Sequence, residues 1–588
     1  MNDSSDDSIP PAAKSSLKQK TSTDRPIKKN SVEDENSNTE QIVFEVAKDK
    51  DSEENQVEDL PMRQITRGEK QCCNAGFYFK VILIAFIFAV CTAAGLYFYF
   101  THEITELQND LDELEEESNL IITSCDELMN MESSTKAFKL FTDIDCITND
   151  PFIPIEQFSG ILDGDSHKIS NLNIICEEST NCGLFGEITS QGRILNLDID
   201  TVKITSLRDC YTSVSHEYFP TGLIGRNEGS IENVTILNAE ITSVCLTGLM
   251  AGLNNGEIEN CSVDGILTST LPEGKVMSLF SVGLFVGKTE DQSLIRDCSS
   301  SGKLILGEGT SVKNHNFGGF LGENEGRTEN CSSAVTIESE NLENLLAEDV
   351  GGFVGENQEF AEIKNCSSTG DVMGYSRVGG LCGKASFDSK IELSSSSGTV
   401  KGSKLVGGLI GWNLGNAHQS SSTSDVSYHA VGSTSEEVIF GGLVGQNEGE
   451  INQCFSKNQI TGNTKVGGGI GENINTGSIK NSYYLNMDSG ESITGSEDCA
   501  GFVVQNEGTI ENCYTMSEID CGDEYACLVG EGTGAVTSSF YAKENCALDS
   551  IGGLDQTDFS SQDNFPDWDS EIWDWTDEYP ILSWENPL

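Results

Sequence analysis

Two carboxylates and a histidine lie within five residues at Asp163-Gly-Asp165-Ser-His167. Such a group can hold a metal ion or take part in acid–base catalysis. The other five histidines are scattered, at His102, His216, His315, His418 and His429. The sequence has no Gly-x-Ser-x-Gly elbow, phosphate-binding loop or zincin motif. We therefore expect no enzymatic activity, cofactor or metal site, and keep a glycan-active enzyme using Asp163 and Asp165 as the alternative.

Of the 20 cysteines, the 17 that follow Val81–Phe100 fall into two kinds of position. One set occupies the same position in successive copies of a sequence repeat: Cys261, Cys298, Cys331 and Cys366. Other copies have serine at this position, at Ser394, Ser420 and Ser482. Parallel stacking gives poor disulfide torsions, so we expect a ladder of small buried thiols at this phase. Cysteines in irregular segments are better disulfide candidates, such as Cys176–Cys182 or Cys521–Cys527.

Four asparagines begin sequons and are candidate N-glycosylation sites: Asn233, Asn260, Asn330 and Asn365. They belong to a set of seven that directly precedes the Cys/Ser phase, together with Asn196, Asn481 and Asn512. An asparagine corner tolerates the left-handed conformation and lets both flanking residues point inward. The two roles compete, because an asparagine stacked inside the coil cannot be glycosylated after folding. The sequence leaves both open.

A repeated motif places these residues, and its clearest copy is Gly441–Cys454, GGLVGQNEGEINQC. Its second glycine or the equivalent recurs at Gly183, Gly222, Gly248, Gly283, Gly319, Gly352, Gly380, Gly408, Gly442, Gly468 and Gly501, and a degenerate twelfth copy starts at Cys527. A signature at such periods marks a solenoid, and its short apolar pieces are the size of strands. The sequence predicts an all-β fold, a right-handed parallel β-helix or β-solenoid of about 12 rungs.

Length varies on one side of each predicted rung. The longest insertions fall around Leu271–Phe280, Gly307–Asn316 and Ser339–Asp349. Loops collected on one edge are a common way for a solenoid to build a binding surface. Neutral drift in a tolerant turn explains the same pattern.

The motif copies GGLVG, GGLIG (Gly407–Gly411) and GGFVG (Gly351–Gly355), each followed by Asn-Glu-Gly or a relative, resemble the GLUG repeat. Phe141–Leu172 resembles the opening rungs of proteins with such repeats, and Ile572–Trp584 resembles their closing segment. The resemblance implies a β-helix-like rod used for adhesion or display on surface and secreted proteins, and no known reaction. It also implies a turn role for the Asp163–His167 segment.

Val81–Phe100 is a run of 20 residues without a charge, long enough to cross a membrane as a helix. Basic residues precede it and acidic residues follow it, which predicts a type II single-pass protein of the plasma membrane. The N-terminus would be cytoplasmic and the C-terminal ectodomain extracellular. Cys72 and Cys73 lie at the cytoplasmic face and are candidates for S-acylation.

We thus divide the chain into a disordered cytoplasmic tail (1–70), a transmembrane helix (76–100), a helical or coiled-coil stalk (101–131), opening rungs (133–182), the solenoid (183–547) and a Trp-rich C-terminal cap (548–588). The stalk has the 3-4 spacing of a coiled coil and could form a homo-oligomer, a single helical spacer being the alternative. Its heptad positions are Ile104, Leu107, Leu111 and Leu114, continued by Ser118, Ile121, Cys125 and Leu128. The aromatic cap is expected to close the solenoid's open end.

The charge balance limits the partners. Lys+Arg number 35 and Asp+Glu 94, a formal net charge of −59. Such a chain repels nucleic acid and anionic glycans. We expect a non-catalytic surface protein that binds an extracellular protein or glycan; a passive structural coat component is a further alternative.

Overall fold

The computed structural model describes residues 120–131, 135–147, 151–176, 181–206, 220–243, 246–269, 281–306, 315–339, 347–430, 438–486, 493–522, 525–546 and 552–586. The chain divides into two units, residues 1–97 and 98–588, and the described residues belong to the second. Among them, no helix is long and apolar enough to cross a membrane. The predicted span Val81–Phe100, the tail with Cys72 and Cys73, and the stalk positions from Ile104 to Leu114 lie outside the described residues.

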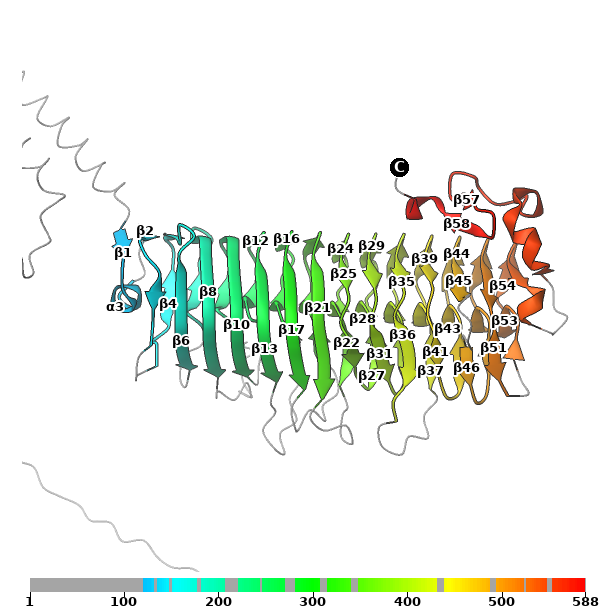
Figure 1. The fold of residues 1–588 in the computed structure, drawn as a ribbon, viewed down its shortest axis with the longest axis horizontal. Helices are drawn as coiled ribbons and strands as arrows, with labels where there is room; N and C mark the ends of the chain where they lie inside the picture. Colours follow the sequence, from blue (N-terminus) through cyan, green and yellow to red (C-terminus); the bar gives the residue numbers. More distant parts are fainter. Residues whose placement is uncertain are drawn as a thin grey trace, which may run out of the picture. The chain divides into compact units, whose positions relative to one another are not determined.

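The described residues form a β-solenoid of stacked coils whose strands make three parallel sheets, here called A, B and C (Figure 1). Each repeat copy contributes one strand to sheet B, and one opening coil precedes them. The predicted solenoid is confirmed. The 13 strands of sheet B are β4 (Ile155–Phe158), β7 (Phe185–Ile188), β9 (Ile224–Asn227), β11 (Ala251–Asn254), β15 (Val286–Thr289), β19 (Leu321–Asn324), β23 (Val354–Asn357), β28 (Cys382–Ala385), β33 (Ile410–Asn413), β38 (Val444–Asn447), β43 (Ile470–Asn473), β48 (Val503–Asn506) and β53 (Val529–Glu531).

Sheet C precedes sheet B in each coil and has nine strands: β14 (Ser281–Gly283), β18 (Asn316–Gly318), β22 (Glu348–Gly351), β27 (Ser376–Gly379), β32 (Leu405–Gly407), β37 (Ile439–Gly441), β42 (Lys465–Gly467), β47 (Cys499–Ala500) and β52 (Tyr525–Ala526). The chain passes between the two sheets through the motif glycine. A Cβ atom added to Gly442 would lie 2.2 Å from the carbonyl oxygen of Gly468 on the next coil. Glycine therefore recurs at this position because successive coils leave no room for a side chain.

Sheet A follows sheet B. Its first row consists of β5 (Ile161–Asp163), β8 (Arg193–Ser206), β10 (Ser230–Ser243), β12 (Glu257–Glu259), β16 (Leu294–Arg296), β20 (Arg327–Glu329), β24 (Glu362–Lys364), β29 (Lys390–Glu392), β34 (Asn416–His418), β39 (Glu450–Asn452), β44 (Ser478–Lys480), β49 (Thr509–Glu511) and β54 (Ala535–Thr537). Strands β8 and β10 run on through the corner that other coils break. The middle residue of these short strands points into the core, and the first and third point outward.

The second row of sheet A lies beyond the asparagine corner. Long strands form it in the early coils: β6 (Lys168–Cys176), β13 (Ser262–Ser269), β17 (Ser299–Leu306) and β21 (Ser332–Ser339). Later coils have two short strands each: β25 (Ser367–Ser368), β26 (Val372–Met373), β30 (Ser395–Ser396), β31 (Thr399–Gly402), β35 (Ser421–Ser422), β36 (Asp425–Tyr428), β40 (Phe455–Ser456), β41 (Ile460–Thr461), β45 (Tyr483–Asn486), β46 (Ile493–Gly495), β50 (Tyr514–Ser517), β51 (Ile519–Cys521) and β55 (Phe540–Ala542).

The predicted insertions all fall at one corner of the coil. The chain leaves sheet A at Ser269, Leu306 and Ser339 and enters sheet C at Ser281, Asn316 and Glu348. The same connection spans only residues 374–375 between β26 and β27. Length variation is therefore confined to the corner from sheet A to sheet C.

The asparagine corner is confirmed. All seven asparagines have left-handed backbones, with φ between 47° and 57°. The next residue is buried, as at Cys261, Cys331 and Cys366, and the same phase is buried at Cys298 and Ser394, where aspartate and leucine take the corner. Its side chain accepts from the backbone N–H of the preceding coil's equivalent, for example Cys366 N to Ser394 Oγ at 3.1 Å. It also donates to a carbonyl oxygen two residues earlier, as from Ser394 to Glu392 at 2.7 Å. Cysteine and serine alternate here because both are small and both donate and accept.

A second, fully buried ladder fills the corner from sheet B to sheet A, and sequence reasoning missed it. It consists of the asparagine of the Asn-Glu-Gly pattern in successive coils. The Asn447 amide donates to the Asn473 oxygen at 2.8 Å, and Asn413 donates to Asn447 at 2.8 Å. These side chains are 0% exposed. The recurrence of Asn-x-Gly beyond each sheet B strand is the sequence signal that could have found it.

The N-terminal end differs from the predicted stalk. Residues 120–122 form β1 (Leu120–Ile122), which pairs in parallel with β2 (Ala137–Leu140), and α3 (Cys125–Met129) buries Cys125 and Leu128 in the main core. The heptad interpretation is therefore wrong for Ile121, Cys125 and Leu128. A five-residue helix covers the first coil, and its apolar spacing reflects that contact rather than a coiled coil.

Among the described residues, four disulfides lie toward the two ends of the stack. They are Cys125–Cys146, Cys176–Cys182, Cys499–Cys521 and Cys527–Cys546, with Cα separations of 5.3 to 6.2 Å. The predicted pair Cys176–Cys182 is confirmed. The pair Cys521–Cys527 is wrong, because each of the two bonds to a cysteine on a neighbouring segment. End coils stack on one neighbour only, and a covalent link compensates for the missing contacts.

The Trp-rich segment packs on the outer face of sheet A and is not confined to the open end. Antiparallel strands β57 (Trp573–Trp575) and β58 (Pro580–Leu582) run back over the last coils (Figure 1). Their tryptophans cover an aromatic row that the solenoid presents outward, formed by Phe455, Tyr483, Tyr514 and Phe540. The segment thus covers an apolar strip of the solenoid's surface and adds packing contacts along its last coils.

Candidate binding face

The turn Asp163–His167 assembles no shared site. The Asp163 carboxylate accepts from the backbone N–H of Asp165 at 2.9 Å, while Asp165 forms an ion pair with Lys139 at 3.1 Å. His167 instead contacts Asp143 at 3.2 Å. Each group holds a separate local contact around a left-handed turn. Among the described residues, no group of three or more His, Cys, Asp and Glu side chains is placed to hold a metal ion.

The buried thiols of Cys454 and Cys513 are poorly suited to nucleophilic chemistry. Burial raises the pKa of Cys454 and of Cys513 to about 12. A thiol with such a pKa stays protonated at neutral pH, and only the thiolate is a good nucleophile. These cysteines act in the corner ladder.

The sequon asparagines face outward. Asn260, Asn330 and Asn365 are exposed, and Asn233 is half-buried. Their side chains stack along the outside of the corner, with the Asn365 amide donating to Asn330 at 2.8 Å and Asn260 donating to Asn233 at 2.5 Å. The asparagine stack therefore lies outside the coil, so the structural role does not bury these candidate glycosylation sites. The S-acylation candidates Cys72 and Cys73 lie outside the described residues.

Buried carboxylates of sheet B are neutralised by cations on neighbouring coils. Glu323, Glu356 and Glu472 are 6–8% exposed. Lys288 approaches Glu323 at 3.0 Å and Lys384 approaches Glu356 at 2.6 Å. Truncating one residue of such an ion pair would leave the other as an unpaired buried charge, so these ion pairs have a structural role.

The outer face of the first row of sheet A carries an exposed ladder of charges. Its ion pairs join neighbouring coils, as in Arg296–Glu259 at 2.9 Å, Lys390–Glu362 at 2.5 Å and Lys364–Glu392 at 3.4 Å. Exposed pairs of this kind add little stability. They fix the positions of the side chains along the face.

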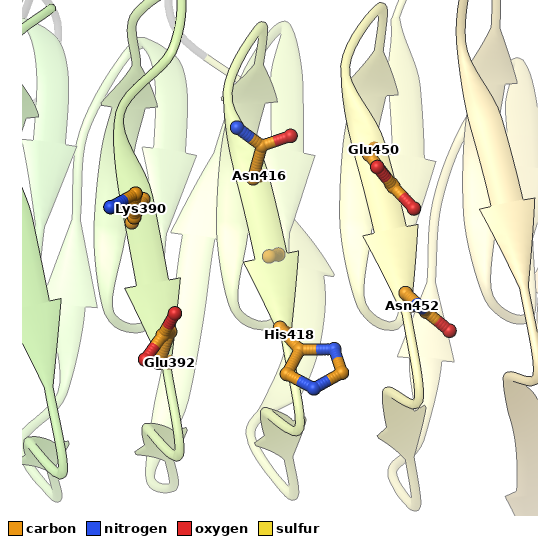
Figure 2. A pocket seen from close by; sticks show the side chains of 7 residues that line it. Lys390, Glu392, Asn416, His418, Glu450 and Asn452 are labelled. Carbon is orange, nitrogen blue, oxygen red and sulfur yellow. The ribbon is translucent and has the colours of Figure 1, made fainter. Parts of the chain in front are cut away.

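The ladder is interrupted at β34, where a shallow hollow of about 280 Å³ opens. Figure 2 shows Lys390 and Glu392 on β29, Asn416 and His418 on β34, and Glu450 and Asn452 on β39. In the described part of the chain, the side chains of Asn416 and His418 have no polar partner, whereas Glu450 pairs with Lys480 at 3.8 Å. An amide and an imidazole thus face solvent between two carboxylates. We call these six residues the sheet A groove.

Two stretches of the chain match known proteins in sequence. Residues 347–373 match the family model of the GLUG motif. The chain carries GLUG repeats. A stretch of 146 residues, 25% of this chain, is 30% identical to halomucin of Haloquadratum walsbyi (strain DSM 16790 / HBSQ001). That match spans 1% of halomucin's length.

Two solved structures are also similar. One is a candidate immunoglobulin A1 protease from Bacteroides ovatus, at 14% identity, covering 79% of this chain and 93% of that one with a TM-score of 0.27. The other is an IgA1 protease at 15% identity, covering 58% and 22% with a TM-score of 0.26. TM-scores this low support no conclusion about this chain.

The matched GLUG repeat contains a side chain that sequence reasoning missed. Phe360 lies in the turn between β23 and β24 and is 68% exposed. Phe387, in the same turn of the next coil, is 62% exposed. The signal was available, because other copies of the repeat have no aromatic residue in this turn. Phe387 precedes Lys390 of the sheet A groove by three residues.

Proposed function

We propose that this chain is a single-pass type II membrane protein that displays a right-handed GLUG-repeat β-solenoid outside the cell for adhesion or ligand recognition, without catalysing a reaction. The sheet A groove is the observation on which the proposal depends. There Asn416 and His418 offer hydrogen-bonding groups to solvent on a rigid sheet, whereas neighbouring positions are committed to ion pairs. Preformed polar groups of this kind bind a ligand at low entropic cost.

Disulfides and exposed sequons support an extracellular location. Four disulfides among the described residues suit an oxidising compartment. The exposed asparagines at 260, 330 and 365 suit a chain that passes through the secretory route. Both lie on the C-terminal side of the sequence Val81–Phe100, which we propose as the anchor.

A glycan-active enzyme is the second candidate, and its only support is the Asp163–His167 segment. Substituting both Asp163 and Asp165 by Asn should abolish any hydrolytic or lyase activity if that candidate is correct. Any activity left unchanged by this variant would exclude these two carboxylates as its catalytic groups.

The full chain, with a tag at its C-terminus, tests the proposal when produced in a host cell that does not adhere. Antibody labelling of the tag on intact cells should show the C-terminus outside. Saturable adhesion to a panel of target cells should follow, and the double variant Asn416→Ala/His418→Ala should reduce it at least tenfold. The variant Thr509→Ala/Glu511→Ala changes the equivalent outward positions of β49 and should not.

Three outcomes would contradict the proposal in different ways. A tag that is reached only after permeabilisation would contradict the topology. Equal loss in both double variants would place the effect in the fold rather than the groove. Correct display without adhesion to any surface would favour the structural coat component.

A further inference from the structure

Phe360 and Phe387 are the only aromatic side chains in the described part of the repeats that are more than 60% exposed. They lie in equivalent turns of neighbouring coils, at the start of β24 and β29. A single exposed apolar residue needs no explanation, but two large exposed rings in the same turn of neighbouring coils do. Nothing in the described structure covers them.

The backbone at Phe360 adds a second observation. Its φ is +66°, in the left-handed region that bulky side chains avoid. The register of β24 and β29 places Asp388 at the equivalent position of the next coil, with φ +56°. Aspartate and asparagine accept this conformation readily. Phe360 therefore costs conformational energy and leaves its ring in water, and strain of this kind is typical of functional positions.

The rings lie beside groups that can form hydrogen bonds. Phe387 is three residues before Lys390, and Leu393, 41% exposed and also left-handed at φ +51°, directly follows Glu392. Strand β29 thus has apolar side chains at both ends and polar ones between them. The two coils beyond it carry the amides, imidazole and carboxylate of the sheet A groove.

We infer that Phe360, Phe387 and the sheet A groove together bind a neutral oligosaccharide. This inference rests on the proposed recognition function. The apolar C–H face of a pyranose ring packs on an aromatic side chain, while amide, carboxylate and imidazole groups bond its hydroxyls. Coils repeat every ~4.8 Å, which is comparable to the length of one sugar ring along a chain.

Charge selects among sugars. Glu362, Glu392 and Glu450 lie on the same face, and the chain has a net charge of −59. These glutamates are paired with Lys390, Lys364 and Lys480, so it is the negative charge of the chain as a whole that disfavours sulfated or uronic saccharides. The site is therefore assigned to uncharged sugars.

The purified full chain tests this on an array of neutral and anionic oligosaccharides. We expect binding to neutral members only, and at least a tenfold loss in Phe360→Asn and in Phe387→Ser. Phe360→Asn should also raise the melting temperature, because asparagine relieves the left-handed strain. A merely structural role would lower it. Ile266→Ala removes another exposed apolar side chain, 40% exposed and outside this turn, and should change neither binding nor melting temperature.

Separate outcomes distinguish this inference from the proposed function. Binding to anionic sugars, or unchanged binding in both phenylalanine variants, would overturn the inference. The inference would also be overturned if the chain bound no sugar on the array but still adhered to cells, and if protease treatment of the cells, but not periodate, destroyed that adhesion. The recognition function would then remain, with a protein as the ligand. Absence of both array binding and cell adhesion would overturn the two together.

Discussion

The side-chain oxygen of Asn413 has no hydrogen-bond donor within the described structure, because Ala385 occupies the equivalent position on the preceding coil. Where asparagines occupy this position on neighbouring coils, they are joined at amide-to-oxygen distances of 2.7–2.8 Å. In an earlier coil Thr289 takes the asparagine position and donates its hydroxyl to Asn324 at 2.8 Å. One alanine thus leaves a buried acceptor unsatisfied, which is costly.

Restoring a donor at position 385 should stabilise the protein. We expect Ala385→Thr to raise the free energy of unfolding by about 1 kcal/mol, the usual net value of one hydrogen bond. Ala385→Val has nearly the same shape without a donor and serves as the control. Urea unfolding of the two variants measures the difference. If the Ala385→Val variant were as stable as the Ala385→Thr variant or more so, packing rather than the missing hydrogen bond would limit stability at this coil.

The contact of Trp584 with the ninth repeat should hold the C-terminal coils together. Its indole N–H donates to the carbonyl oxygen of Gln453 at 3.0 Å, and its ring lies 5.5 Å from that of Phe455. Trp584→Ala should lower the free energy of unfolding by about 2–3 kcal/mol, less than full truncation of a buried Trp. Trp584→Phe, which keeps a ring but loses the bond, should cost about 1 kcal/mol.

Thermal and chemical unfolding test this contact, with Phe141→Ala as the control because that ring is 69% exposed. The control should change stability by less than about 0.5 kcal/mol. A Trp584→Ala variant as stable as wild type would mean that the packing of the C-terminal segment does not stabilise sheet A.

Acid should destabilise the solenoid through His315. Burial lowers the pKa of this histidine to about 4, against 6.5 for an ordinary one, and its side chain is 1% exposed. Between these values the unfolded chain takes up a proton that the folded chain does not, so stability falls as the pH drops from 6.5 to 4. The loss approaches roughly 3 kcal/mol over this window.

Comparing His315→Gln with wild type isolates this contribution, because other acidic groups titrate equally in both. The variant should show a shallower fall of unfolding free energy between pH 6.5 and 4. Parallel curves for the two proteins would exclude His315 as a source of acid sensitivity.

Glycans on neighbouring coils should exclude one another. The strand register places Asn365 next to Asn330 and Asn260 next to Asn233. Coils are ~4.8 Å apart, too close for two branched glycans side by side. Mass spectrometry of glycopeptides spanning each pair, from protein made in a eukaryotic host, should find at most one occupied site per pair. Two glycans on one such pair would contradict the stacked arrangement, and empty sequons throughout would count against the extracellular topology.

The repeating part of the fold could be predicted from sequence because its constraints are local and recur in every coil. Gly442 is glycine since the next coil's carbonyl leaves no space, and Asn260 is asparagine since its backbone is left-handed. Each constraint favours one residue type at one phase. Twelve repetitions make the pattern readable without a structure.

The ends and the site escaped prediction because they depend on contacts that do not repeat. The apolar spacing of Ile121, Cys125 and Leu128 fits a coiled coil, and only the pairing of β1 with β2 shows that it belongs to the first coil. The groove lies where Asn416 on β34 is shorter than Lys390 and Glu450, its register neighbours on β29 and β39. Such an arrangement is visible only when coils far apart in sequence are set in register.

Site-specific photo-crosslinking tests most directly whether the outer face of sheet A is the face that binds. A photoreactive residue would replace Ser478, which borders the groove beside Glu450, or Gln446, which points outward from sheet B, in the full chain displayed on cells. Contact with ligand-bearing target cells should give an adduct from position 478 and none from position 446. An adduct from position 446 alone would place recognition on another face and contradict the account.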